Sequence, residues 1–204
     1  MKKLLFTVVL AALILPFAAA QGKLVVGQKA PEWVLTDASK KDFTMDSWPG
    51  KVLQINYVDP DNDDLNDPFN DAIDKAVDID KVIDKNYFKG FGIVDLQSTK
   101  LPDGLVRAIA GRKAKKYDTT ILFDYKGLLH EIWDMPKDSY TIVIVDKNRI
   151  VRGVYKGKIA DGDIPGIVDM ILKLTKSNQT IANKKTGESQ FFYACLPGSF
   201  CYGH

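Results

Sequence analysis

The order of its apolar segments is the feature that most constrains how this chain can fold. Residues 51–58 and 91–96 are short and rich in aliphatic and aromatic side chains, which is typical of buried strands. Residues 67–82 and 101–117 repeat apolar side chains at the spacing of one face of an α-helix. Because strands alternate with helices in this way, we predict an α/β fold.

The second half of the chain adds further strands and one last helix. Four strands are predicted there: residues 119–123, 128–133, 140–145 and 149–155. Asp163 caps a final amphipathic helix. Two short strands, residues 33–36 and 43–45, flank a polar turn and are expected to form an N-terminal β-hairpin. We therefore expect a central mixed β-sheet flanked by helices, followed from residue 177 by a polar and then aromatic tail.

The N-terminal segment has the pattern of a secretory signal peptide. Lys2 and Lys3 precede an uncharged, largely apolar run over residues 4–17, and three alanines follow it. We expect cleavage between Ala20 and Gln21, and a periplasmic location in a cell that has an outer membrane. The alternative is a transmembrane anchor, which needs roughly 20 apolar residues and therefore a longer run than this one.

The charge of the chain limits the partners that it can have. The formal net charge is +2, and the two lysines of the leader account for it, so the mature chain is close to neutral. Neutralising the phosphates of a nucleic acid requires a basic surface, and adsorption on anionic lipids requires one too. We therefore predict no nucleic-acid partner and, after cleavage of the leader, no membrane partner.

Three motifs resemble exported thioredoxin-like proteins. Residues 26–31 (Val-Gly-Gln-Lys-Ala-Pro) are similar to the lead-in of those proteins, and residues 50–57 are similar to their glycine–lysine strand. Residues 138–147 resemble the strand that ends in an Asp-Lys turn in the same superfamily. The resemblance implies a thioredoxin-like fold.

A narrower resemblance is to the YtfJ-type periplasmic proteins, a small thioredoxin-like family whose role is poorly understood. Residues 110–117, 119–124 and 133–139 carry it, and the likeness as a whole covers residues 25–175. We accordingly divide the chain into three parts: a signal peptide (1–20), a thioredoxin-like domain (21–176) and a C-terminal tail (177–204).

The chain departs from catalytic thioredoxin-like proteins at both halves of their redox site. Those proteins place a reactive cysteine directly after the strand that corresponds to residues 51–57, at the start of a helix that lowers the thiol pKa. Here residues 58–65 contain no sulfur. The place of their second hallmark, a cis-proline, holds Ser139-Tyr140-Thr141. We therefore assign no catalytic residue and no cofactor, because a fold is retained without its activity in many families.

The two cysteines, Cys195 and Cys201, lie close together in the tail and bracket a Pro-Gly turn. In an oxidising compartment this spacing predicts a disulfide that fastens the tail. Two alternatives stay open at this point. The pair can serve as redox-active thiols, or it can bind a metal together with His204, which would need a fourth ligand.

Two further features have a functional and a structural interpretation. Asp59, Asp61 and Asp63 alternate like the first ligands of a calcium-binding loop, but the glycine and the glutamate that complete such a loop are absent. A solvated loop before a helix is the structural interpretation, and no metal ligands are assigned. His130 lies on the predicted strand 128–133 and is interpreted as a surface or hydrogen-bonded sheet residue.

The leading functional hypothesis is a non-catalytic exported thioredoxin-like protein that binds a protein partner or a small ligand in the periplasm. The alternative hypothesis is a thiol–disulfide oxidoreductase that uses the Cys195–Cys201 pair.

Overall fold

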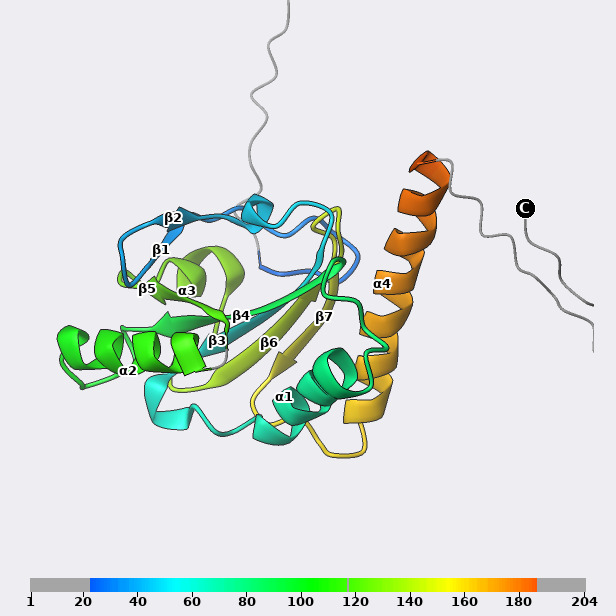
Figure 1. The fold of residues 1–204 in the computed structure, drawn as a ribbon. Coiled ribbons are helices and arrows are strands. Elements are labelled where there is room, and N and C mark those ends of the chain that lie inside the picture. The colour runs from blue at the N-terminus through cyan, green and yellow to red at the C-terminus, as the bar shows by residue number, and fades with distance from the viewer. Residues whose placement is uncertain (1–22, 117, 187–204) are drawn as a thin grey trace, which may run out of the picture.

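The computed structural model describes residues 23–116 and 118–186, which contain a mixed sheet of seven strands (Figure 1). The strand order in the sheet is β2-β1-β5-β4-β3-β6-β7. The strands in chain order are β1 (Leu35–Asp37), β2 (Asp42–Phe43), β3 (Val52–Val58), β4 (Phe88–Asp95), β5 (Thr120–Asp124), β6 (Tyr140–Val145) and β7 (Val151–Lys156).

Four α-helices and three shorter helical segments join the strands in this part of the chain. The α-helices are α1 (Asp67–Asp74), α2 (Asp103–Lys116), α3 (Leu128–Trp133) and α4 (Ile164–Thr186). Two 3-10 turns, η1 (Met45–Ser47) and η2 (Pro60–Asn62), precede β3 and α1, and the π-helical segment η3 (Lys75–Ile79) prolongs α1. None of the described helices combines the length and the hydropathy that crossing a membrane requires. The predicted α/β architecture with a mixed sheet is confirmed.

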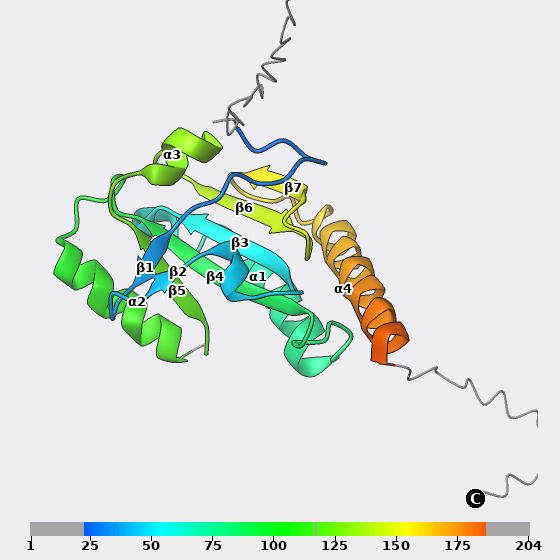
Figure 2. The same ribbon diagram turned by 90° about the horizontal axis from the view of Figure 1, so that it is seen from above.

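Strands β3, β4 and β5 are parallel neighbours, and α1 and α2 connect them. Parallel strands that are joined by a helix cross over with one hand, so two successive crossovers in the same direction place both helices on one face of the sheet. Helix α4 packs on this face as well, against α1 and against β6 (Figures 1 and 2).

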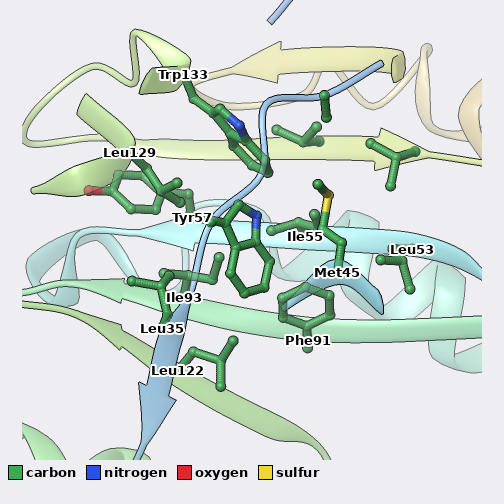
Figure 3. Close-up of a cluster of buried hydrophobic side chains, with 14 of the residues drawn as sticks. Leu35, Met45, Leu53, Ile55, Tyr57, Phe91, Ile93, Leu122, Leu129 and Trp133 are labelled. Atoms are coloured by element: carbon green, nitrogen blue, oxygen red, sulfur yellow. The ribbon is translucent and has the colours of Figure 1, made fainter. Parts of the chain in front are cut away.

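The other face of the sheet carries the largest apolar core. Side chains of β3 and β4 point into it, and the N-terminal segment and α3 cover it (Figure 3). Trp33 and Trp133 meet edge to face at its centre, with 6.4 Å between their ring centroids. Ile55, Ile93 and their neighbours on this face are fully buried.

The N-terminal hairpin joins the sheet. β1 pairs with β2, as the sequence predicts, and also runs antiparallel to β5. The segment that precedes β1 is hydrogen-bonded to the region around the start of β7. The backbone N–H of Gly27 donates to the carbonyl of Val151, and that of Ala30 donates to the carbonyl of Arg149. Residues 27–30 are therefore tied to β7 and to the turn that precedes it.

The prediction of a strand over residues 128–133 was wrong, because this segment is helix α3. Gly127 adopts a left-handed backbone conformation with φ of 67°, and the carboxylate of Asp124 accepts the backbone N–H groups of Leu128 and Leu129. This cap supplies partners for the free N–H groups of a helix start, so one turn of helix forms. An apolar run of six residues is compatible with the two-residue period of a strand and with the 3.6-residue period of a helix. Here the cap favours the helix.

Helix α4 continues beyond Ser177, where the composition of the chain changes, and ends at Thr186. The beginning of the tail is thus helical. The remainder of the tail lies outside the described residues.

Arg149 fixes the N-terminal segment to the turn between β6 and β7. Its side chain is 5% exposed, and its guanidinium donates hydrogen bonds to the backbone carbonyls of Trp48 (2.8 Å) and Lys51 (3.0 Å) and to the carboxylate of Asp46 (3.2 Å). Three donors in a planar fork therefore join two parts of the chain that lie about a hundred residues apart.

We predict that Arg149→Ala lowers the free energy of unfolding by about 3 kcal/mol, because several charge-assisted hydrogen bonds are lost together. Urea denaturation followed by tryptophan fluorescence measures this change. Arg112→Ala, at an exposed position of α2, is the matched control and should change stability by less than about 0.5 kcal/mol. Equal effects of the two variants would contradict the anchoring role.

Candidate functional site

The turn after β3 occupies the place where catalytic thioredoxin-like proteins carry their thiol. Here Asp59 is buried, and its carboxylate accepts hydrogen bonds from the backbone N–H of Asp61 (3.1 Å) and from the side chain of Asn62 (2.6 Å). The backbone N–H of Asp59 donates to the carbonyl of Ser139 (3.0 Å), at the position of the missing cis-proline. The redox position is therefore replaced by a turn whose polar groups bond to one another.

The three aspartates of the calcium hypothesis do not converge. Asp59 is engaged within the turn, whereas Asp63 forms an ion pair with Lys113 of α2. Within residues 23–116 and 118–186, no three or more His, Cys, Asp or Glu side chains are grouped so that they could hold a metal ion. The geometry gives the calcium hypothesis no support.

The remaining residues singled out in the sequence lie outside the part of the chain that the structure describes. These are the cleavage-site residues Ala20 and Gln21, the cysteine pair Cys195 and Cys201, and His204. Their predicted roles stay predictions.

His130 belongs to a polar cluster beneath the edge where β3, β4 and β5 end. Its Nε2 lies 2.9 Å from Asp95 Oδ2 and 3.2 Å from the hydroxyl of Tyr57, and its Nδ1 lies 2.8 Å from the carbonyl of Met135. The Tyr57 hydroxyl also lies 3.3 Å from Asp124 Oδ2. Burial, with the carboxylates of Asp124 and Asp95 adding to it, raises the pKa of Tyr57 far above its usual range.

Both ring nitrogens of His130 face hydrogen-bond acceptors, the carbonyl of Met135 at Nδ1 and the carboxylate of Asp95 at Nε2. The ring thus links α3 to the buried carboxylate of Asp95 and, through the hydroxyl of Tyr57, to that of Asp124. Because only 12% of the His130 side chain is exposed, the cluster has little room for a ligand and serves to hold α3 on the sheet.

We predict that His130→Ala lowers the free energy of unfolding by about 2–3 kcal/mol, because it removes the ring that contacts the buried Asp95 carboxylate, the Tyr57 hydroxyl and the Met135 carbonyl. Chemical denaturation measures the loss. Glu131→Ala, at the next and exposed position of α3, is the control and should be nearly neutral. A loss below about 1 kcal/mol for the histidine variant would contradict the role of this cluster in holding α3 on the sheet.

An open groove of about 660 Å³ lies on the other face of the sheet, between α1 and α2. Its floor is formed by the middle of β3 and β4, where Gln54 pairs with Gly90 and Asn56 pairs with Gly92. On the same face, apolar side chains of the sheet pack with α1 and α4 in one cluster and with α2 in another. The groove runs between these two packed regions.

Carboxamide side chains line the floor of the groove. The Gln54 Nε2 donates hydrogen bonds to Asn56 Oδ1 and to Asn70 Oδ1 (both 3.1 Å), and the Asn70 amide donates to the hydroxyl of Tyr140 (3.0 Å). The Gln54 Oε1 has no hydrogen-bond partner among the described residues, although Gln54 is 2% exposed. Polar groups this deep normally have a partner, so the network lacks one donor.

The sequence pattern alone did not lead to a prediction of this floor. One signal was available: Gln54 and Asn56 alternate with apolar residues in a strand that is central to the sheet, where an apolar side chain is expected on both faces. Two glycines at alternate positions of the next strand were the second part of that signal. Only the register of β3 and β4 shows that the four residues are neighbours.

A stripe of aspartates forms the α1 wall of the groove. Asp67, Asp71, Asp74 and Asp78 lie on one side of this helix and its π-helical extension. Burial and the neighbouring carboxylates raise the pKa of Asp67 above its usual range, and the same causes raise the pKa of Asp74. The stripe thus concentrates negative charge along one side of the groove.

We predict that Asp74 destabilises the folded protein at neutral pH. Its pKa is higher in the folded state than the ordinary 3.8, so the folded state binds the proton more tightly than the unfolded chain does. The contribution of this proton to the free energy of unfolding is fully present below pH 3.8, and it is lost as the pH rises through the raised pKa of Asp74.

Urea midpoints at about pH 7 and about pH 4 test this prediction. Asp74→Asn should be more stable than the native protein at the higher pH and should gain less on acidification. Asp161→Asn changes a residue outside the groove, so its urea midpoint should shift between the two pH values as much as that of the native protein. If acidification changes the stability of Asp74→Asn and Asp161→Asn equally, the Asp74 carboxylate does not destabilise the folded protein at neutral pH.

Comparisons with solved structures identify the fold. A candidate thiol:disulfide interchange protein DsbE of Chlorobium tepidum has a TM-score of 0.55 and 16% identity, over 75% of this chain and 99% of its own. A candidate thioredoxin of Neisseria meningitidis has a TM-score of 0.52 and 19% identity, over 74% and 94%. A candidate protein disulfide isomerase of Bacteroides thetaiotaomicron has a TM-score of 0.55 and 15% identity, over 78% and 95%.

These identities show the fold alone, and the fold is thioredoxin-like, as the sequence predicts. No curated protein matches the sequence closely enough to count as a relative. The family model described as a bacterial protein of unknown function (YtfJ_HI0045) matches residues 23–174. The chain therefore belongs to the YtfJ_HI0045 family, whose thioredoxin-like fold here lacks sulfur at the redox position.

Proposed function

We propose that this protein is an exported, non-catalytic binding protein that holds a ligand or a segment of a partner in the groove between α1 and α2. The groove is a concave surface over the middle of the parallel strands β3 and β4, and polar groups converge on its floor. Sites of this kind combine apolar walls with a few placed polar groups. The signal-peptide pattern supports binding in the periplasm.

The observation that carries the proposal is the pair of glycines in β4. Neither Gly90 nor Gly92 has a positive φ, so the backbone does not require glycine at either position. A Cβ on Gly92 would meet Ile121 Cγ1 at 3.9 Å and the Asn56 carbonyl at 4.0 Å, which are ordinary contacts, so packing does not require glycine either.

Glycine inside a strand weakens the strand, and it often marks a place where a ligand approaches the backbone closely. A side chain at either position would project into the groove and fill part of its floor. We infer that these two positions are kept open for an occupant.

The proposal excludes thioredoxin-type catalysis at the edge of the sheet. That reaction needs a low-pKa thiol after β3, and here Asp59 and Asn62 fill the turn with their own hydrogen bonds. The alternative is a reaction at the cysteine pair of the tail, Cys195 and Cys201.

We predict that Gly92→Val abolishes binding without loss of stability. The test uses the full chain in which both cysteines are serine, and proton–nitrogen correlation NMR spectra record its response to amino acids, dipeptides, diamines, dicarboxylates and sugars. At least one class should shift the signals of Gly90, Gly92 and the Gln54 side chain. Gly92→Val should remove these shifts, and its free energy of unfolding should stay equal or rise by up to about 1 kcal/mol.

Gly104→Ala, on the exposed start of α2 and away from the groove, is the control and should bind like the native chain. Two results would contradict the proposal. One is a panel in which no compound shifts the groove signals, and the other is insulin reduction by the native protein that disappears in Cys195→Ser.

A further inference from the structure

The unpaired carboxylates on the α1 wall indicate the charge of the occupant. Asp63, which precedes α1, forms an ion pair with Lys113, and Asp78, at the end of the stripe, forms one with Lys85. Between them, Asp67, Asp71 and Asp74 have no ion pair and no side-chain hydrogen bond among the described residues. Three neighbouring carboxylates therefore face the groove without a counter-charge in direct contact.

The charge of the whole lining has the same sign. Among the described residues that line the groove, seven are aspartates and four are lysines. Two of the lysines are used by the ion pairs with Asp63 and Asp78, and a third, Lys51, donates a hydrogen bond to a backbone carbonyl. Burial lowers the pKa of the fourth lysine, Lys89, against the opposing effect of the Asp118 carboxylate.

The floor provides an independent observation that points to the same ligand. The Oε1 of Gln54 is an acceptor without a donor, in a side chain that is 2% exposed and lines the groove. The other two carboxamide oxygens already accept hydrogen bonds within the network. The site therefore combines free negative charge on its wall with an unmet acceptor in its floor, and both are satisfied by a positively charged N–H donor.

The shape of the groove distinguishes an organic cation from a metal ion. Asp67 and Asp74 are two turns apart on the helix, at a rise of about 1.5 Å per residue, so their carboxylates lie along a line and cannot enclose a single ion. No metal-holding group is found among the described residues. The apolar residues Val58, Val77, Val106, Ile109 and Ile121 also line the groove and suit the methylene chain of an alkylamine.

We propose that the groove binds an alkylammonium group, with Asp67, Asp71 and Asp74 as its counter-ions and the carboxamide floor as its hydrogen-bonding partner. This inference rests on the proposed function, because it names the chemistry of the ligand at the same site. The ammonium group can belong to a free diamine or to a lysine side chain of a peptide, and the chemistry of recognition is the same for both.

Isothermal titration and NMR titration with three five-carbon compounds test the charge preference. Cadaverine carries two ammonium groups, pentanediol is its neutral analogue, and glutarate is its negatively charged analogue. Cadaverine should shift the Gly90, Gly92 and Gln54 signals and should bind at least about tenfold more tightly than either analogue, as expected for a charge-assisted hydrogen bond. Its affinity should fall when the salt concentration is raised to about 0.5 M.

Matched variants locate the binding. Asp71→Asn combined with Asp74→Asn should weaken cadaverine binding by about tenfold or more, while the fold becomes no less stable. Asp161→Asn removes one negative charge outside the groove and should leave the affinity unchanged within about twofold. The acetylated and amidated peptide Gly-Lys-Gly, compared with its norleucine counterpart, distinguishes a lysine side chain from a free diamine as the source of the ammonium group.

The outcomes separate this inference from the proposed function. If glutarate or pentanediol shifts the groove signals and cadaverine does not, the ammonium preference is wrong while the groove remains a binding site. If the Asp71/Asp74 variant binds cadaverine as tightly as the Asp161 variant, the acidic wall is only a solvated helix face. If none of these compounds or peptides reaches the groove, the inference is overturned, and the broader panel decides the proposed function.

Discussion

The position of β3 at the centre of the sheet is the constraint on which the rest of this structure depends. The strand pairs in parallel with β4 and antiparallel with β6, so both of its edges are saturated by backbone hydrogen bonds. Its side chains alternate between the two faces, as they must in any strand. Leu53, Ile55 and Tyr57 enter the large core under the N-terminal segment, whereas Gln54 and Asn56 face the helices. One strand thus supplies the core on one side and the floor of the groove on the other.

The side chains on the two faces of the sheet contribute differently to stability. On the core side, fully buried apolar groups contribute the hydrophobic stabilisation, and the polar groups around His130 lie close to partners, although the buried Nε1 of Trp33 has none among the described residues. On the helix side, the domain forgoes stabilisation at three places: two glycines in a strand, an acceptor without a donor, and a line of repelling aspartates. Unfavourable features that coincide at one surface are typical of a functional site, because selection for stability alone would remove them.

The loss of the redox site follows the same principle. The turn after β3 still lies at the end of a parallel strand, next to the segment that leads into β6. In the thioredoxin-like fold this position can activate a thiol, but Asp59 now fills it and bonds to its own turn. The solved structures that share the fold are described as redox proteins or as thioredoxins, and the shared feature is the architecture of the sheet. A fold that places catalytic groups at one edge of its sheet in some proteins can bind a ligand on an adjacent surface in others.

The sequence by itself determined the α/β order, the mixed sheet, the family and the absence of sulfur after β3, because these follow from local periodicity and from motifs in a fixed order. The prediction of a strand over residues 128–133 was wrong. An apolar run of six residues is compatible with a strand and with a helix, and the Asp124 carboxylate, which caps the segment, favours the helix. Only the tertiary structure brought Gln54 next to Gly90 and Asn56 next to Gly92, because the register between two parallel strands is set across an intervening helix. It likewise placed the α1 aspartates along the same groove, since which face of a helix lies over the sheet depends on packing with the rest of the fold.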